Sequence, residues 1–277
     1  MFRVKKALNH NTVLAIGMDD NQEYLLIGKG IGFGRKVSER MEVPEGCTVY
    51  SLYEKTERGS AMELVKGMNP VFLEIAEQVL KEGERTFGKI DWSILFPMAD
   101  HIAFAVKRIQ NQEQISNPLT GDIRALFHME YKTAECVIPI LKEKLQVEID
   151  EHEVGYIALH IHSAIENENV ALSMQIARTV RECIQLVETE TGASIDVMSL
   201  SYNRLMNHVR YMVARALKGE KLKLDMNDYM SIKFPDEFRM ASTVCGHLEN
   251  YLKKPLDPVE IGYLAMHIQR VSAEQDT

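Results

Sequence analysis

The C-terminal part of the chain repeats itself at a fixed spacing. Two pairs of segments carry the repeat, each pair separated by 107 residues: EVGYIALHI (153–161) with EIGYLAMHI (260–268), and DHIAFAVKR (100–108) with NHVRYMVAR (207–215). The same offset pairs three further positions: Phe127 with Phe234, Glu130 with Glu237, and Tyr131 with Phe238. Three separated segments that share one offset are hard to obtain by chance. The sequence therefore predicts two copies of one domain, over residues 67–170 and 171–277.

The repeated part is predicted to be all-α. From Asn69 onward apolar residues recur at i, i+3, i+4 and i+7, as in Val71–Leu80 and Ala99–Ile109. This period matches one buried face of a helix. Each copy should therefore form a helical bundle.

The first 53 residues have a different pattern. Four short β-type runs, RVKKAL, TVLAIG, EYLLIG and CTVYSLY, are separated by turn-forming residues such as Asp19 and Asn21. We therefore expect a small antiparallel sheet domain over residues 1–56, followed by a linker at 57–66 that contains Gly59 and Ser60. A unit of this size buries little surface alone, so dimerisation is expected to complete its core.

The charge is unevenly distributed. The whole chain carries −8, yet residues 1–40 hold seven basic and four acidic residues, a net charge of +3, which leaves −11 on the other 237. A cationic N-terminal module on an acidic body favours a nucleic-acid partner for that module, although a solvated surface would look similar. No apolar run is long enough for a membrane span or a signal peptide. We expect a cytoplasmic protein without membrane insertion.

Four histidines occupy equivalent positions of the repeat: His101 with His208, and His160 with His267. Each first histidine is followed seven residues later by an arginine, and each second one is preceded seven residues earlier by a glutamate. A structural role on a helix is the commoner fate of one histidine, and duplication alone does not exclude it. Zinc is disfavoured because no pair has i, i+4 spacing, and no nucleophile motif indicates an enzyme. Neutral imidazole can accept a phosphoryl group reversibly, which suits a switch.

The loop GKGIGFG at 28–34 departs from known phosphate-binding motifs. Phe33 stands at the third glycine position of a dinucleotide fingerprint, and no helix is expected after the loop. A flexible hairpin with no ligand is one interpretation. The other is RNA binding, in which Phe33 stacks on a splayed base while Lys29, Arg35 and Lys36 meet phosphates. Asn9 and Asn11 would add contacts to a base or ribose.

Taken together, VKKALNHNTVL, GKGIGFGRK and the two repeated histidine motifs closely resemble the BglG/SacY family of transcriptional antiterminators. The resemblance covers essentially the whole chain and is strongest to the branch that controls glucose-transport genes. It implies a co-antiterminator RNA-binding domain followed by two phosphotransferase-system (PTS) regulation domains. No metal, cofactor or enzymatic activity is implied.

The resemblance also implies partners and sites. A homodimer would bind a leader-mRNA hairpin and so prevent a terminator from forming, and phosphorylation by a sugar-specific PTS permease (enzyme II) and by the phosphocarrier HPr would control it. The phosphorylated residues would be His101, His160, His208 and His267. The RNA-contacting residues would be Lys6, Asn9, Asn11, Gly28, Lys29, Gly30 and Phe33. His10 departs from the asparagine that is common there.

Two other functions remain open at this point. A DNA-binding activator with the same regulation domains would need a helix-turn-helix, whereas residues 1–53 alternate like strands. A phosphocarrier that relays phosphate through its histidines would lack affinity for nucleic acid. A binding assay against a leader RNA separates these interpretations.

Overall fold

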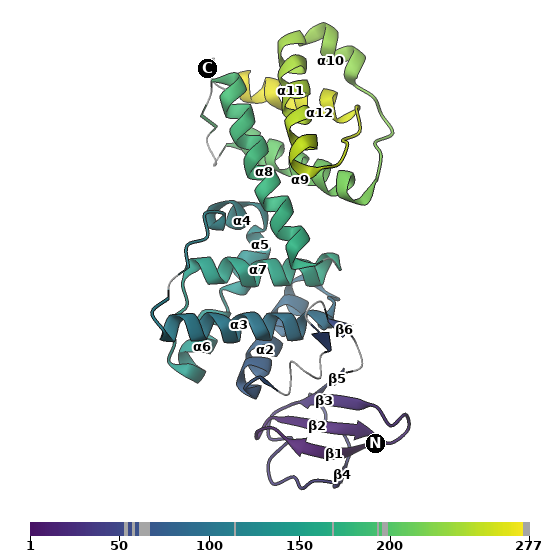
Figure 1. The fold of residues 1–277 in the computed structure, drawn as a ribbon, viewed down its shortest axis with the longest axis vertical. Helices are drawn as coiled ribbons and strands as arrows, with labels where there is room; N and C mark the ends of the chain where they lie inside the picture. Colours follow the sequence, from purple (N-terminus) through teal and green to yellow (C-terminus); the bar gives the residue numbers. More distant parts are fainter. Residues whose placement is uncertain are drawn as a thin grey trace. The chain divides into compact units, whose positions relative to one another are not determined.

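The computed structural model describes residues 1–52, 55–56, 59–60, 67–113, 115–167, 169–192, 194–195 and 199–273 (Figure 1). The chain forms two compact units. Their ranges are Met1–Thr120 with Phe127–Val170, and Gly121–Leu126 with Ala171–Thr277. No helix among the described residues has the length and apolarity that crossing a membrane requires.

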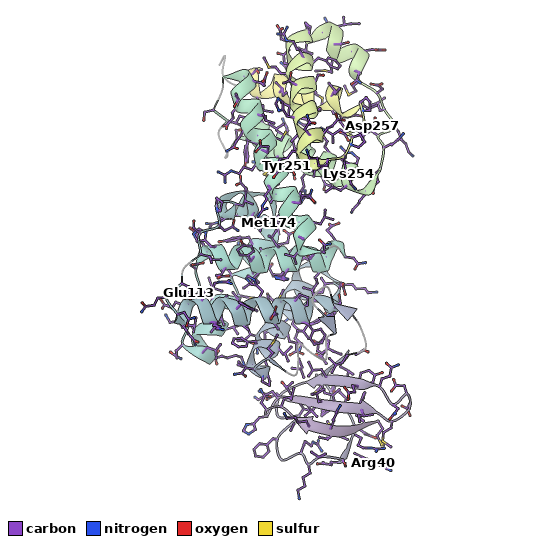
Figure 2. All side chains as sticks on the ribbon, in the orientation of Figure 1. Arg40, Glu113, Met174, Tyr251, Lys254 and Asp257 are labelled. Atoms are coloured by element: carbon purple, nitrogen blue, oxygen red, sulfur yellow. The ribbon has the colours of Figure 1, made fainter. Side chains whose placement is uncertain are left out.

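The first unit begins with a five-stranded antiparallel sheet in the order β4-β1-β2-β3-β5. The strands are β1 (Phe2–Ala7), β2 (Thr12–Gly17), β3 (Glu23–Ile27), β4 (Arg40–Met41) and β5 (Thr48–Ser51). Side chains of β1 to β4, together with Ile31 from the loop after β3, build one small core: Val4, Val13, Ala15, Leu26, Ile31 and Met41. The expected sheet is confirmed, with one addition. The edge strand β4, where Arg40 is exposed (Figure 2), is too short to show a periodic pattern.

A second, two-stranded sheet lies around the predicted linker. It pairs β6 (Lys55–Thr56) with β7 (Gly59–Ser60), so backbone pairing enters the first residues of the segment expected to be a linker. Residues 57–58 and 61–66 of that segment lie outside the described residues.

The helices that complete the first unit are α2 (Pro70–Phe87), the 3-10 turn η1 (Trp92–Ile94), α3 (Leu95–Gln110), α5 (His128–Ala134), α6 (Val137–Leu145) and α7 (Glu151–Glu166). In this helical part α3 packs against α7, α2 packs against α3, and α5 packs against α7 (Figure 1). Local sequence signals explain their starts. Asn69 caps α2 by accepting from the Val71 amide, with Pro70 at the first helical position, and Asp150 caps α7 by accepting from the Glu153 amide.

The second unit repeats this pattern. Its helices are α4 (Thr120–Leu126), which starts at the last residue of the first unit, α8 (Val170–Thr191), α9 (Leu200–Lys218), α10 (Asn227–Lys233), α11 (Pro235–Leu252) and α12 (Glu260–Ala273). An ion pair between Asp122 and Arg181, 3.1 Å long, ties α4 to α8. Residues 121–126 of α4 group with the second unit by their contacts, although α4 lies 107 residues before α10 and is its counterpart in the first repeat copy. The mainly helical character of both copies is confirmed.

Candidate functional site

The glycine-rich loop and the asparagine turn form one surface at one end of the first sheet. Within the turn, the Asn11 amide donates to Oδ1 of Asn9 at 2.8 Å. Oδ1 of Asn11 then accepts from the Gly30 amide at 2.9 Å, and its carbonyl accepts from the Gly28 amide at 2.9 Å. The two segments that the sequence singled out separately are therefore held together by the side chain and the backbone of Asn11.

Glycine is required at two positions of this surface. A side chain at Gly32 would run into the carbonyl oxygen of Asn9, which packs directly against it. Gly30 has φ +73°, a left-handed conformation that is costly for other residues. The glycines thus bring the loop close to the turn and shape its bend.

The loop presents one aromatic ring to solvent. Phe33 is 71% exposed, and its ring meets the edge of the His10 ring at a centroid distance of 5.3 Å. Lys6 and Lys29 are exposed, whereas Arg35 is engaged by Glu39 at 2.6 Å. An exposed phenylalanine in the same loop as an exposed lysine makes this loop a candidate binding surface. His10, which supports this ring, carries no sequence signal beyond its unusual identity.

The asparagine side chains also contact a helix of the same unit. Nδ2 of Asn9 donates to Oε1 of Glu74 at 2.6 Å, and Nδ2 of Asn11 donates to Oε2 at 3.1 Å. Glu74 lies on α2, is only 7% exposed and also meets Lys144 at 3.4 Å. No sequence pattern connects residues so far apart along the chain, so this contact was not predicted.

In the first repeat copy the residues of the repeated motifs form a cluster of polar side chains on α3 and α7. Nε2 of His101 lies 3.1 Å from Oε2 of Glu153, while Arg108 donates to Oε1 of Glu153 through Nη2 at 2.6 Å and Nε at 3.2 Å. The rings of His101 and His160 lie 5.4 Å apart, and Tyr156 packs 5.4 Å from the His101 ring. The sequence placed each histidine with one partner, and the structure brings all of them together.

The second copy builds the equivalent cluster on α9 and α12. Arg215 binds both oxygens of Glu260, through Nε at 2.7 Å and Nη2 at 3.0 Å. Nε2 of His208 lies 3.7 Å from Oε2 of Glu260. The rings of His208 and His267 stack at 4.8 Å, and Tyr263 stacks on His208 at 6.0 Å.

The two glutamates are among the most buried charges of the chain. Glu153 is 1% and Glu260 2% exposed, and both lie in the first turn of their helix, where the helix dipole favours a carboxylate. Burial alone would raise the pKa of the Glu153 carboxyl, but the nearby His101 and the hydrogen-bonded Arg108 outweigh it and hold that pKa below its usual value.

The histidines of the second copy are held neutral. Burial, followed by the charges of His267 and Arg215, lowers the pKa of His208 to about 3. Burial, followed by Arg270 and Arg204, lowers the pKa of His267 to about 4. A neutral imidazole keeps one nitrogen lone pair free to act as a nucleophile.

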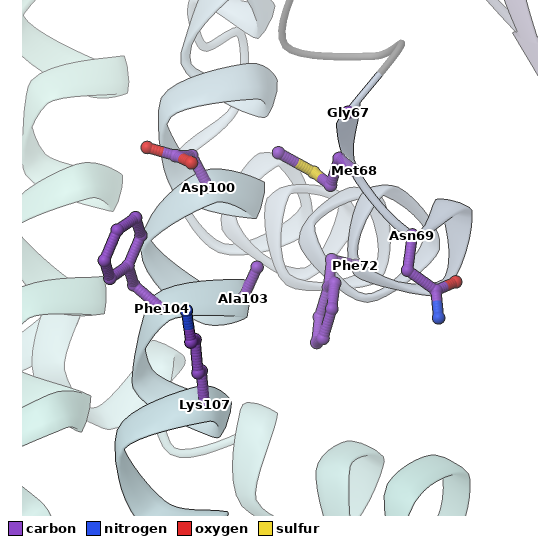
Figure 3. Close-up of a pocket in the computed structure, with 8 residues that line it drawn as sticks. All are labelled: Gly67, Met68, Asn69, Phe72, Asp100, Ala103, Phe104 and Lys107. Atoms are coloured by element: carbon purple, nitrogen blue, oxygen red, sulfur yellow. The ribbon is translucent and has the colours of Figure 1, made fainter. Parts of the chain in front are cut away.

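A pocket of about 390 Å³ opens between the start of α2 and α3 (Figure 3). Its lining includes Asp100, which directly precedes His101, and Phe104, which is 53% exposed. Tyr211, at the equivalent place in the second copy, is 54% exposed. Both copies therefore present an aromatic ring one helical turn after their first histidine.

His162 lies outside these clusters and has a structural environment. His162 lies 3.0 Å from Glu130 and packs on Phe127, a pairing that the second copy lacks because Gln269 replaces the histidine. Among the described residues no group of three potential metal ligands comes together. The four cysteines are free thiols.

Comparison with known proteins assigns both parts of the chain. The family described as "CAT RNA binding domain" matches residues 2–58, and "PRD domain" matches residues 73–164 and 181–271. Protein GlcT of Staphylococcus epidermidis is 30% identical over 98% of this chain and 97% of that protein. The GlcA/glcB genes antiterminator of Staphylococcus carnosus is 27% identical over 99% and 96%. The crystal structure of GlcT CAT-PRDI is 32% identical with a TM-score of 0.51, covering 59% of this chain and 98% of that one.

Proposed function

The chain belongs to the family of RNA-binding transcriptional antiterminators in which a CAT RNA-binding domain precedes two PRD domains, and from this premise we propose that it binds a leader-RNA hairpin as a homodimer. Binding prevents a competing terminator hairpin from forming, so transcription continues. Relatives named GlcT and glcA/glcB antiterminator make a sugar-transport operon the expected target. Because the nascent transcript is the ligand, the protein works in the cytoplasm.

The joined surface of the asparagine turn and the glycine loop carries this proposal. Phe33 offers a ring for base stacking, and Lys6 and Lys29 offer charges for phosphates. The amides of Asn9 and Asn11 are suited to base or ribose oxygens. Gly30 is exposed with open space around it, so its backbone allows RNA to approach closely, whereas Gly28 is buried and makes room for Cys47 within the loop.

An RNA-binding measurement tests the site. Phe33→Ala in the full chain should weaken binding to the leader hairpin by about 1–3 kcal/mol, because one stacking contact is lost. Val37→Ala is the matched control, since Val37 is 69% exposed in the same connection but outside the loop. Equal affinities of the two variants would show that the RNA binds elsewhere.

Control of this binding resides in the two histidine clusters. His101 and His160 accept phosphoryl groups from the sugar-specific permease, and His208 and His267 accept them from HPr. The cluster geometry supports this because each copy joins two imidazoles to a buried carboxylate and an arginine. A phosphoryl group adds about −1.5 to −2 charges, which repel the carboxylate and attract the arginine, and so rearrange the cluster.

The exposed aromatic rings support self-association near these clusters. Phe104 and Tyr211 share a helix face with His101 and His208, since residues three apart are neighbours on a helix. A homodimer that covers these rings would place the phosphorylated histidines near its interface. Phosphorylation would then act on the dimer as well as on one chain.

A further inference from the structure

We propose that Glu153 is a positioning residue for the phosphorylation of His101, turning Nε2 of the ring inward so that Nδ1 accepts the phosphoryl group. Glu260 has the same place beside His208. The inference rests on the proposed function, because it assigns the reacting atom of a site that the proposed function uses.

The orientation of the first histidine is the same in both copies. Nε2 of His101 and Nε2 of His208 are both buried and both face the carboxylate of their copy, at 3.1 Å and 3.7 Å. Tyr156 and Tyr263 pack against these rings and limit their rotation. An incoming phosphorus atom cannot reach a buried nitrogen, which leaves Nδ1.

The second histidine of each pair is turned the other way. Nδ1 is the buried ring nitrogen of His160 and of His267. Opposite ring nitrogens are therefore buried in the two histidines of one cluster. If all four are phosphorylated, the first of each pair should carry the group on Nδ1 and the second on Nε2.

The carboxylate also suits the chemistry of transfer. A neutral imidazole has one N–H and one lone pair. With the proton on Nε2, the Nδ1 lone pair attacks the phosphorus of a phosphohistidine on the donor protein. The N–P bond to His101 forms as the donor N–P bond breaks, and that electron pair returns to the donor ring, which leaves neutral when its other nitrogen is protonated. The His101 ring keeps its Nε2 proton and becomes cationic, and Glu153 stabilises that charge.

The test uses the full chain and two phosphoryl donors. Potassium phosphoramidate, a small chemical donor, needs no partner protein, and phosphorylated permease is the second donor. Two-dimensional NMR that correlates ring protons with ¹⁵N and ³¹P identifies the protonated and the phosphorylated nitrogen. We expect a proton on Nε2 of His101 before reaction and phosphorus on Nδ1 after it.

Glu153→Gln should slow phosphorylation of His101 about tenfold, because the new cation loses its counter-charge. Glu151→Gln, an exposed carboxylate in the same helical turn, is the control and should react like the unaltered chain. Phosphorus on Nε2 of His101, or an unchanged rate in Glu153→Gln, overturns the inference. Reaction with phosphoramidate at Nδ1 but not with the permease leaves the inference standing and overturns the proposed function instead.

A separate observation concerns the RNA surface: we infer that Glu74 competes with RNA for the amides of Asn9 and Asn11. Their Oδ1 atoms already accept backbone hydrogen bonds within the site, so the two Nδ2 groups are what these side chains offer a ligand. Both Nδ2 groups donate to Glu74. A carboxylate, like a phosphate, is an anionic acceptor, so RNA must displace it.

Neighbouring contacts reinforce this arrangement. Glu77, one turn further along α2, accepts from the Thr48 hydroxyl at 2.6 Å, and Tyr50 packs near Trp92 and Phe96 at centroid distances of 5.8 and 6.4 Å. The contact thus has both polar and apolar parts. The contact of Glu74 with Asn9 and Asn11 thus lowers the affinity for RNA, and the first regulatory domain supplies the carboxylate.

RNA affinity of the full chain tests this inference. Glu74→Ala and Glu74→Gln should each bind the hairpin about three- to tenfold more tightly, since the anion no longer holds the amides. Glu82→Ala, whose carboxylate pairs with Arg85 on the surface of the same helix, is the control. Unchanged or weaker binding by both Glu74 variants overturns the inference. If Phe33→Ala also binds like the unaltered chain, the RNA site itself is wrong.

Discussion

The two regulatory domains contain the same cluster of residues but differ in how the shared carboxylate is used. In the first domain Arg108 occupies one oxygen of Glu153, and the other lies 3.1 Å from His101. In the second domain Arg215 occupies both oxygens of Glu260, and His208 lies 3.7 Å away. The first carboxylate therefore serves the histidine as well as the arginine, whereas the second serves mainly the arginine.

Because of this difference, the two domains can differ in how readily their histidines are phosphorylated although their sequences are similar. A carboxylate that shares its charge with a histidine can stabilise the cation formed on phosphorylation. A carboxylate neutralised by an arginine fork does so less well, because its charge is already compensated. We therefore expect the first domain to be the more readily phosphorylated, although both domains carry the same residue types.

Removal of each carboxylate should have the largest effect on stability. Glu260→Ala and Glu153→Ala leave Arg215 and Arg108 without their counter-charge in a mostly buried cluster, which should cost about 3–5 kcal/mol of unfolding free energy. The loss should be greater for Glu260, which makes the two-pronged contact. Denaturant unfolding measures it, with Glu151→Ala as control. A larger loss for Glu153→Ala would reverse the comparison.

The second-largest expected effect is a difference between the two domains in how their stability falls at acidic pH. The pKa values of His208 and His267 lie below the ordinary 6.5, so between about pH 4 and 6.5 the unfolded chain binds more protons than the folded one. The stability that these residues contribute is complete above pH 6.5 and is lost as the pH falls through that window, by about 2 kcal/mol for each histidine at pH 5. The lowered pKa of Glu153 gives a contribution that is lost only below about pH 4.5.

Hydrogen exchange can follow this for each domain separately. Peptides from α9 and α12 should lose protection between pH 7 and 5, while fluorescence of Trp92, the single tryptophan, reports on the first domain. His267→Gln should reduce the pH dependence of the second domain. Equal acid sensitivity of α9 in the unaltered chain and in this variant would argue against the buried neutral histidine.

The exposed rings should give the smallest effect. Phe104→Ala and Tyr211→Ala each remove an aromatic side chain from the face that carries the first histidine of a domain. If that face lies in a dimer interface, self-association should weaken by about 1 kcal/mol or more. Sedimentation equilibrium measures this, with the exposed Met129→Ala as control. The domain whose variant weakens the dimer more is the one that contributes more to the interface.

Much of this organisation was predictable from sequence because it rests on local or repeated patterns. The 107-residue offset identified the four histidines, and the strand alternation predicted the sheet. The orientation of the Arg108 and Arg215 side chains was not predictable. It depends on the packing of two helices whose paired arginine and glutamate lie 45 residues apart in the chain. The contact of Glu74 with Asn9 was not predictable for the same reason, because nothing in the chain between these residues, which lie 65 positions apart, determines how the sheet packs against α2. The short strand β4 lacks enough residues for a pattern.

The central claim is that phosphorylation of the first histidine cluster controls RNA binding. Its most direct test is to incubate the full chain with phosphorylated sugar permease and to measure phosphate per histidine by mass spectrometry and affinity for the leader hairpin in the same samples. RNA affinity should fall in proportion to phosphate on His101 and His160, and His101→Asp should mimic the loss while His101→Ala binds RNA regardless of the permease. Phosphate confined to other residues, or phosphorylated protein with full RNA affinity, would contradict the account.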